Sequence, residues 1–217
     1  MGESDPPYRS NSPQAVAEML RAGIRDALAE QRCDVVGFSF GGLIGGFLAL
    51  LEPASVRSLT IVGTTGWRGV RTNQIDLRLV RGLQPDEQWA AHRENLQRIM
   101  IADAEAIDDD AIWIQAWHAV HARVNTREFY KKGSLQDVIP RLKVPINAIW
   151  GELDAIAWPH VREREDLLHD LNPNVQFRQI PQAGHWVAYE RAEEFNRVLL
   201  ELLSRTPRES VRSRLAP

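Results

Sequence analysis

The chain has 217 residues, a formal net charge of −3 and a single cysteine, Cys33. This length predicts one domain, or one domain with an insertion, and 44% apolar residues suffice for a substantial core. The charge balance argues against a nucleic-acid partner attracted by bulk charge, and one cysteine excludes an internal disulfide framework. We expect a soluble, cytoplasmic protein, because the longest apolar run, residues 41–51, is too short to span a bilayer.

The first third of the chain alternates helical and extended patterns. Ser12-Pro13 is typical of a helix start, and apolar residues then recur every four positions along one helix face. Residues 34–38 and 56–62 are valine-rich or apolar and predict buried strands, and the apolar stretch 40–51 between them predicts a helix. Strands that alternate with helices indicate an α/β fold, with a parallel sheet and right-handed crossovers.

Residues 37–41 read Gly-Phe-Ser-Phe-Gly at the junction of the first strand and its helix. A serine on such a turn takes a strained backbone conformation, and its close-packed flanks require very small residues. The turn lifts the Ser39 hydroxyl out of the sheet and places the Phe40 backbone N–H at a helix N-terminus, where developing negative charge is stabilised. The pattern alone is weak, and an ordinary glycine-rich turn is the alternative to a nucleophile.

Residues 68–133 break the alternation and read as predominantly helical. Pro85 opens one helix, and the acidic run Asp108-Asp109-Asp110 caps a second helix and complements its dipole. On the second helix, Trp113 and Trp117 share one stripe. Such a stripe is a packing surface by default, and a lining of a substrate pocket is the alternative.

His118 and His121 are three residues apart on the second of these helices, a spacing that allows two metal ligands on one face. A third ligand is not nearby in the sequence, so we predict no metal site. We expect His118 to be a polar group that faces the pocket or the solvent.

A nucleophilic serine needs a base, and the base needs an acid that orients it. Two later segments of the chain supply candidates for these partners. Residues 144–150 read as a buried strand that runs into the turn Gly151-Glu152-Leu153-Asp154. Residues 175–180 alternate like a strand and lead into Gly184-His185-Trp186. Serine, acid and histidine therefore each follow a strand, and open α/β sheets bind ligands at that edge.

The three segments around Ser39, Asp154 and His185 resemble the signatures of the α/β-hydrolase fold family. Residues 184–203 also resemble that family's last loop and helix. The resemblance implies that Ser39 is the nucleophile, Asp154 the acid and His185 the base. Glu152 is a rival for the acid.

The same resemblance implies a division of the chain. The core comprises residues 1–67 and 134–203, the helical insertion 68–133 is a cap over the serine, and residues 204–217 form a flexible tail. Trp186 is a packing residue beside the site or a ligand contact. The possible pocket residues are Phe38, Trp113, Trp117, His118 and Trp186.

The implied reaction is two-step hydrolysis of a carboxylic ester or a similar carbonyl compound through an acyl-enzyme, without cofactor or metal. One alternative is carbon–carbon bond hydrolysis of aromatic ring-cleavage products, whose hydrolases the last segment resembles. Against it, Phe38 precedes the serine, where those enzymes tend to carry asparagine. A non-catalytic protein that keeps the fold is a second alternative.

The N-terminal part looks short for this family, in which several strands precede the elbow strand. Residues 2–7 resemble the Gly-x-Ser-Asp-x-Pro loop that follows the fourth strand in relatives. We therefore expect a chain that starts partway through the fold and lacks the second N–H of the oxyanion hole. The elbow strand would have one unpaired edge, so we expect a poorly soluble or homo-oligomeric and weakly active product.

Overall fold

The structure is a computed structural model that describes residues 12–28, 31–122 and 129–206. Its strands are β1 (Cys33–Phe38), β2 (Val56–Val62), β3 (Ile146–Gly151) and β4 (Gln176–Ile180). Its longer helices are α1 (Pro13–Leu28), α2 (Phe40–Leu51), α3 (Pro85–Ile99), α4 (Asp109–His121), α7 (Arg162–Leu171) and α9 (Ala192–Ser204). Its short helical segments are η1 (Ala104–Ala106), α6 (Leu135–Val138), η2 (Ile139–Arg141) and α8 (Val187–Glu190). No helix in these ranges is long and apolar enough to cross a membrane.

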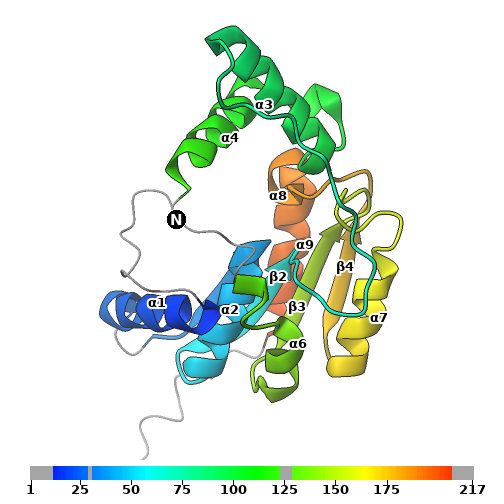
Figure 1. Ribbon diagram of the computed structural model, residues 1–217. Coiled ribbons are helices and arrows are strands. Elements are labelled where there is room, and N and C mark those ends of the chain that lie inside the picture. Colours follow the sequence, from blue (N-terminus) through cyan, green and yellow to red (C-terminus); the bar gives the residue numbers. More distant parts are fainter. Residues whose placement is uncertain (1–11, 29–30, 123–128, 207–217) are drawn as a thin grey trace, which may run out of the picture.

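The described strands form one parallel sheet with the order β1-β2-β3-β4 (Figure 1). The register sets Gly37 opposite Ile61, and Ile61 opposite Ala148. Because the strands are parallel, their carboxyl ends lie at one edge, where the segments after β1, β3 and β4 emerge. The predicted parallel sheet and its four strands are confirmed, with ends that shift by one or two residues.

Apolar side chains that alternate along the strands feed two cores, one on each face of the sheet. Leu59, Ile61 and Trp150 pack beneath α2, α6 and α7. Val62 and Ile149 point to the opposite face and pack against α9. Because helices cover both faces of the sheet, β2 and β3 are buried along almost their whole length.

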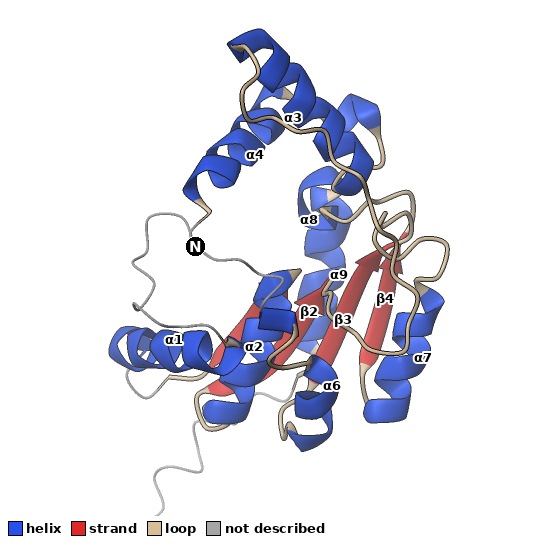
Figure 2. Ribbon diagram, viewed as in Figure 1, coloured by secondary structure: helices blue, strands red, loops and turns tan. Residues whose placement is uncertain are grey.

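The segment between β2 and β3 carries α3 and α4, which stand beyond the carboxyl ends of the strands (Figure 2). The predicted helix starts are confirmed: α3 begins at Pro85, and Asp108 Oδ1 caps α4 by accepting a hydrogen bond from Ala111 N at 2.8 Å. The helical character does not extend over residues 68–84, which form a loop. Asn95 of α3 holds this loop, accepting from Arg78 N and donating to Arg78 O.

Two predictions for the ends of the chain fall partly outside the described residues. α1 begins at Pro13, as the sequence predicts, and residues 1–11 lie outside the described ranges. α9 ends at Ser204, and the predicted tail lies outside them from residue 207 on.

Candidate active site

Ser39 occupies a tight turn between β1 and α2. Its backbone has φ 50° and ψ −116°, a conformation that few non-glycine residues adopt. Ser39 N donates to Val62 O at 2.7 Å, which ties the turn to the end of β2. A side chain at Gly37 would overlap the carbonyl of Gly41, so the turn closes only with glycine there. The predicted strained turn is confirmed.

The second flanking glycine has a different explanation from the one the sequence suggests. A Cβ at Gly41 would meet no atom within 4 Å, so the close contact concerns its backbone and not its missing side chain. The neighbouring Gly42 is the crowded position, because a Cβ there would overlap the Thr64 hydroxyl. The small residues of the turn therefore fit against both β1 and the segment after β2.

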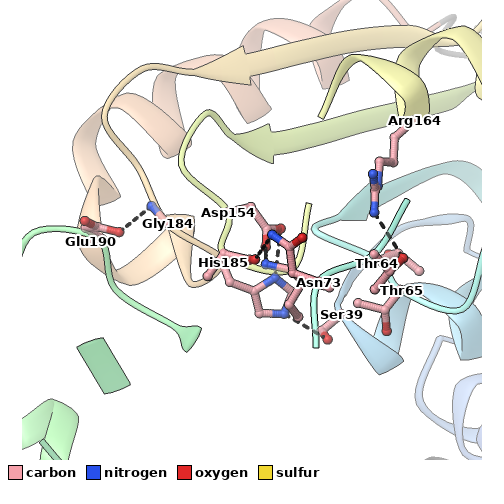
Figure 3. Close-up of polar contacts among 12 residues, drawn as sticks. Ser39, Thr64, Thr65, Asn73, Asp154, Arg164, Gly184, His185 and Glu190 are labelled. Carbon is pink, nitrogen blue, oxygen red and sulfur yellow. Dashed lines mark hydrogen bonds and ion pairs between the residues drawn. The ribbon is translucent and has the colours of Figure 1, made fainter. Parts of the chain in front are cut away.

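The three predicted chemical groups converge at the carboxyl edge of the sheet (Figure 3). His185 Nε2 lies 3.1 Å from Ser39 Oγ, and His185 Nδ1 lies 2.9 Å from Asp154 Oδ2. Asp154 and His185 are buried, and Asp154 Oδ1 also accepts a hydrogen bond from Ile156 N at 3.0 Å. The imidazole is thus held between a hydroxyl and a carboxylate, in the order that nucleophilic catalysis requires.

Glu152, the rival acid, is directed elsewhere. Its Oε2 accepts a hydrogen bond from Gln182 N at 2.9 Å, which fastens the turn after β4. Gln182 has φ 53°, so this turn needs such support. The carboxylate that contacts His185 is that of Asp154.

A buried carboxylate fixes the loop that carries His185. Glu190 Oε2 accepts from Gly184 N at 2.6 Å, and Glu190 Oε1 accepts from Asp103 N at 2.7 Å. Trp186 N donates to Met100 O at 2.7 Å. The histidine loop is therefore bonded directly to the segment that follows α3. The sequence marks Glu190 only through the family resemblance and does not indicate this role.

The loop after β3 is fastened in a similar way. Asn73 Nδ2 donates to Ala155 O at 2.9 Å and to Trp158 O at 2.5 Å, and Asn73 N donates to Ile156 O at 2.9 Å (Figure 3). A side chain from the segment 68–84 thus holds the backbone on either side of Ile156, two residues beyond Asp154. Nothing in the local sequence around Asn73 indicates this contact.

Phe40 lies at the first position of α2, so its N–H has no acceptor within the helix. Its ring packs edge-on against Phe129 and Tyr130, at 5.3 and 6.2 Å between centroids. The positive end of the α2 dipole and this N–H make the space beside Ser39 favourable for negative charge.

Two of the predicted pocket residues lie beside His185. The Phe38 ring lies 5.0 Å from the His185 imidazole, centroid to centroid. Trp186 stacks on Tyr189 at 4.5 Å and packs against the apolar cluster formed by the α3–α4 segment. Trp186 thus makes packing contacts beside the site, and its contact with a ligand stays a prediction.

The other predicted pocket residues lie on α4 and are exposed. Trp113 and Trp117 have 56% and 38% of their surface exposed, and their rings stack at 5.5 Å. Trp117 also stacks on His121 at 3.8 Å, and His118 is exposed. The default interpretation of this stripe as core packing is therefore wrong, because these side chains extend from the α4 surface.

The contact between α4 and α8 shifts the proton affinities of two groups. Tyr189 Oη donates to Asp108 Oδ1 at 2.5 Å. Partial burial, followed by this hydrogen bond, raises the pKa of Tyr189 to about 12. The same hydrogen bond is the main cause that lowers the pKa of Asp108, with a contribution from the Ala111 N–H. In the described ranges, no three His, Cys, Asp or Glu side chains gather as a metal site.

Known proteins are similar to this chain in sequence and in fold. A family model described as the alpha/beta hydrolase family matches residues 1–198. A relative from Paraburkholderia xenovorans (strain LB400), a 2-hydroxy-6-oxononadienedioate/2-hydroxy-6-oxononatrienedioate hydrolase, is 27% identical over 218 residues. That alignment covers 93% of this chain and 72% of the relative.

Two solved structures show the same fold. The meta-cleavage product hydrolase CumD from Pseudomonas fluorescens IP01 superposes with a TM-score of 0.70 at 22% identity, covering 95% of this chain and 77% of that one. Naproxen esterase from Bacillus subtilis gives a TM-score of 0.70 at 17% identity, covering 93% and 70%. The family model matches most of the chain's length, and the relative is a hydrolase. The protein is therefore a hydrolase, and the chain belongs to the alpha/beta hydrolase family.

Proposed function

We propose that the protein is a serine hydrolase in which Ser39, His185 and Asp154 act as a catalytic triad. The observation that carries the proposal is the hydrogen-bonded row from Ser39 Oγ through the imidazole to Asp154 Oδ2, with distances of 3.1 and 2.9 Å. The strained backbone of Ser39 supports it, because such strain persists where the surrounding structure enforces a functional geometry.

The reaction would proceed in two steps. His185 Nε2 accepts the proton of Ser39 as Oγ attacks a carbonyl carbon, and Asp154 stabilises the imidazolium that forms. The oxyanion is directed at the Phe40 N–H, and His185 returns the proton to the leaving group. Water, activated by the same imidazole, then releases the acyl group from Ser39. Each step uses only groups of the chain and water, without a cofactor.

The substrate that we propose is a small carboxylic ester or a similar carbonyl compound. The Phe38 ring beside His185 gives this side of the site an apolar wall, which suits an uncharged acyl or alcohol group. Trp113 and Trp117 are candidates for further contacts, as exposed aromatic side chains of the insertion.

A second candidate is carbon–carbon bond hydrolysis of a ring-cleavage product. The names of the Paraburkholderia relative and of CumD favour it. In that reaction the hydroxyl of water goes to the acyl carbon and its proton to the departing carbon. Phe38 weighs against it, because a phenyl ring offers no hydrogen bond to the substrate at that position.

The two substrate classes can be compared directly on the full chain. Purified protein would be given 4-nitrophenyl esters of increasing acyl length and, separately, 2-hydroxy-6-oxononadienedioate. We expect measurable turnover of short esters, abolished by Ser39→Ala, and slower or no turnover of the dienedioate. Faster turnover of the dienedioate would select the second candidate. Turnover of neither by a folded protein would favour a non-catalytic role.

A further inference from the structure

Arg164, at the start of α7, is a buried guanidinium with unusual partners. Its relative exposure is 2%. Among the described residues its hydrogen bonds go to uncharged oxygens, His160 O at 2.9 Å and Thr72 Oγ1 at 3.2 Å. A buried cation without a paired carboxylate is costly, because desolvation is not offset by a direct ion pair. Such a group calls for an explanation other than surface solubility.

The side chain of Arg164 lines a small, narrow cavity beside Asp154. The cavity has a volume of about 10 Å³, room for a single water molecule, and Thr64 and Asp154 also line it. Thr64 Oγ1 is buried and has no hydrogen-bond partner among the described protein groups. Figure 3 shows Arg164 directed toward the segment that carries Thr64 and Thr65.

The cavity lies directly beneath the acid of the candidate triad. A Cβ at Gly63, which also lines it, would lie 3.4 Å from Asp154 Oδ2 and 3.2 Å from the His185 ring. Burial lowers the pKa of Arg164, and the Asp154 carboxylate is the main group that opposes this effect. The Arg164 guanidinium and the Asp154 carboxylate thus attract each other electrostatically, although no direct ion pair joins them.

We propose that Arg164 is a positioning residue for Asp154, acting through its fixed charge and through one internal water held between its guanidinium and the Thr64 hydroxyl. The water would satisfy Thr64 Oγ1, and the cation would attract the Asp154 carboxylate and help to keep it directed at His185. This inference deepens the proposed function, since it concerns the acid of the proposed triad. Arg164 itself touches no substrate.

The charged groups around this pair give the sign of the expected effect. Asp154 faces His185 and Arg164, and Arg164 also lies next to Glu163, whose Oε1 and Oε2 are engaged by Arg71. Removing the cation makes the Asp154–His185 pair easier to protonate. A neutral replacement at position 164 should therefore move the protonation of His185 to higher pH, and a lysine should largely restore it.

The first test follows the His185 ring by NMR in histidine-labelled full-length protein, with His185→Ala to assign its signals. We expect the titration midpoint of His185 to move up by about half a pH unit or more in Arg164→Met. Arg164→Lys should stay close to the parent protein. Arg164→Gln serves as a second neutral variant in case the methionine variant does not fold. An unchanged midpoint in a folded neutral variant would overturn the proposal.

The second test addresses the water. Thr64→Val keeps the shape of the side chain but removes the hydroxyl, whereas Thr64→Ser keeps it. We expect Thr64→Val to slow the labelling of Ser39 by a fluorophosphonate several-fold with little change in melting temperature, and Thr64→Ser to react like the parent. Equal rates for valine and serine would overturn the role of the water.

The two tests separate this inference from the proposed function. Absence of fluorophosphonate labelling in a folded parent protein, together with a shifted His185 titration, would leave the positioning role standing and reject the hydrolase mechanism. Normal labelling with an unshifted titration would do the reverse.

Discussion

The strained conformation of Ser39 depends on a glycine two residues earlier. A Cβ at Gly37 would collide with backbone atoms of Gly41, which cannot rotate away, whereas a Cβ at Gly41 would meet open space. We therefore expect Gly37→Ala to cost about 1–3 kcal/mol of stability and to displace Ser39 from His185. Gly41→Ala should change stability by less than about 0.5 kcal/mol. Urea unfolding of both variants checks the pair, and equal costs would contradict this account of the turn.

Single residues also mark the limit of what could be predicted from the sequence. Ser39, Asp154 and His185 were predictable because each follows a strand in a short and characteristic turn. Arg164 was not, since the segment around it reads as a solvated, charged helix. Its burial depends on packing between α7 and loops distant in the sequence, which a local pattern does not encode.

At the level of elements, strands and capped helices were predictable, but the loop 68–84 was not. Apolar runs predicted β1 to β3, and an alternating pattern predicted β4, all to within two residues. Pro85 and Asp108 predicted the starts of α3 and α4. The loop has no periodicity of its own. Its Asn73 donates to the backbone of the loop after β3, and Asn95 of α3 binds the loop backbone at Arg78, so its course depends on tertiary contacts.

Glu190 joins the histidine loop to the segment after α3, and its two oxygens serve two backbone donors. A glutamine has one carbonyl oxygen, so Glu190→Gln leaves one of these two N–H groups without its acceptor. We expect a loss of about 1–3 kcal/mol in unfolding free energy and faster hydrogen exchange at Gly184 or Asp103. Glu194→Gln, at an exposed ion pair on α9, is the matched control and should have little effect. Unchanged hydrogen exchange at both amides would refute this role of Glu190.

The contact between Tyr189 and Asp108 predicts a pH dependence of the α4–α8 packing. The pKa of Asp108 is lowered from 3.8, so its contribution to stability is present above that pH and is lost as pH falls through the lower folded value. The pKa of Tyr189 is raised from 10.0 to about 12, so its contribution is present below pH 10 and is lost as pH rises through about 12.

Tyr189→Phe tests this dependence, because it removes the hydroxyl that Asp108 accepts from. We expect a lower melting temperature for the variant, by an amount that is constant between about pH 5 and 9 and shrinks towards pH 3. Melting curves of parent and variant across this range provide the measurement. A difference that grows as the pH falls would have the wrong sign for this account.

For the whole molecule, the β1 edge of the sheet bears most directly on self-association. In the described ranges β1 has a neighbour only on the β2 side, and Val36 on it is 44% exposed. The groove between α1, β1 and α2 has a volume of about 370 Å³ and is lined mainly by apolar side chains. An unpaired, apolar edge strand favours pairing with a second copy of the chain.

We therefore predict that the 217-residue chain self-associates, and that Val36→Lys reduces this association. Light scattering after size-exclusion chromatography measures it. Leu200→Lys, at an exposed apolar residue of α9, is the control and should leave association unchanged. A monomeric parent protein, or an equal effect of both lysines, would contradict the prediction.

Family and fold class were predictable for the whole molecule, because the motifs that carry the resemblance lie in strand–turn segments. The arrangement of the helical insertion was harder to predict from the sequence. The exposure of Trp113 and Trp117 follows from how α3 and α4 stand over the sheet, and helical periodicity gives a stripe without saying what it faces.

The most direct test of the proposed triad is covalent labelling of Ser39 by a fluorophosphonate, read by peptide mass spectrometry. The account predicts one modified peptide containing Ser39. Labelling should be absent in Ser39→Ala and slowed at least about a thousandfold in His185→Ala and Asp154→Asn, with little added loss when the last two are combined. Glu152→Gln should label like the parent, because that carboxylate accepts from Gln182 N. A folded protein labelled elsewhere, or labelled at Ser39 equally fast without His185, would contradict the triad.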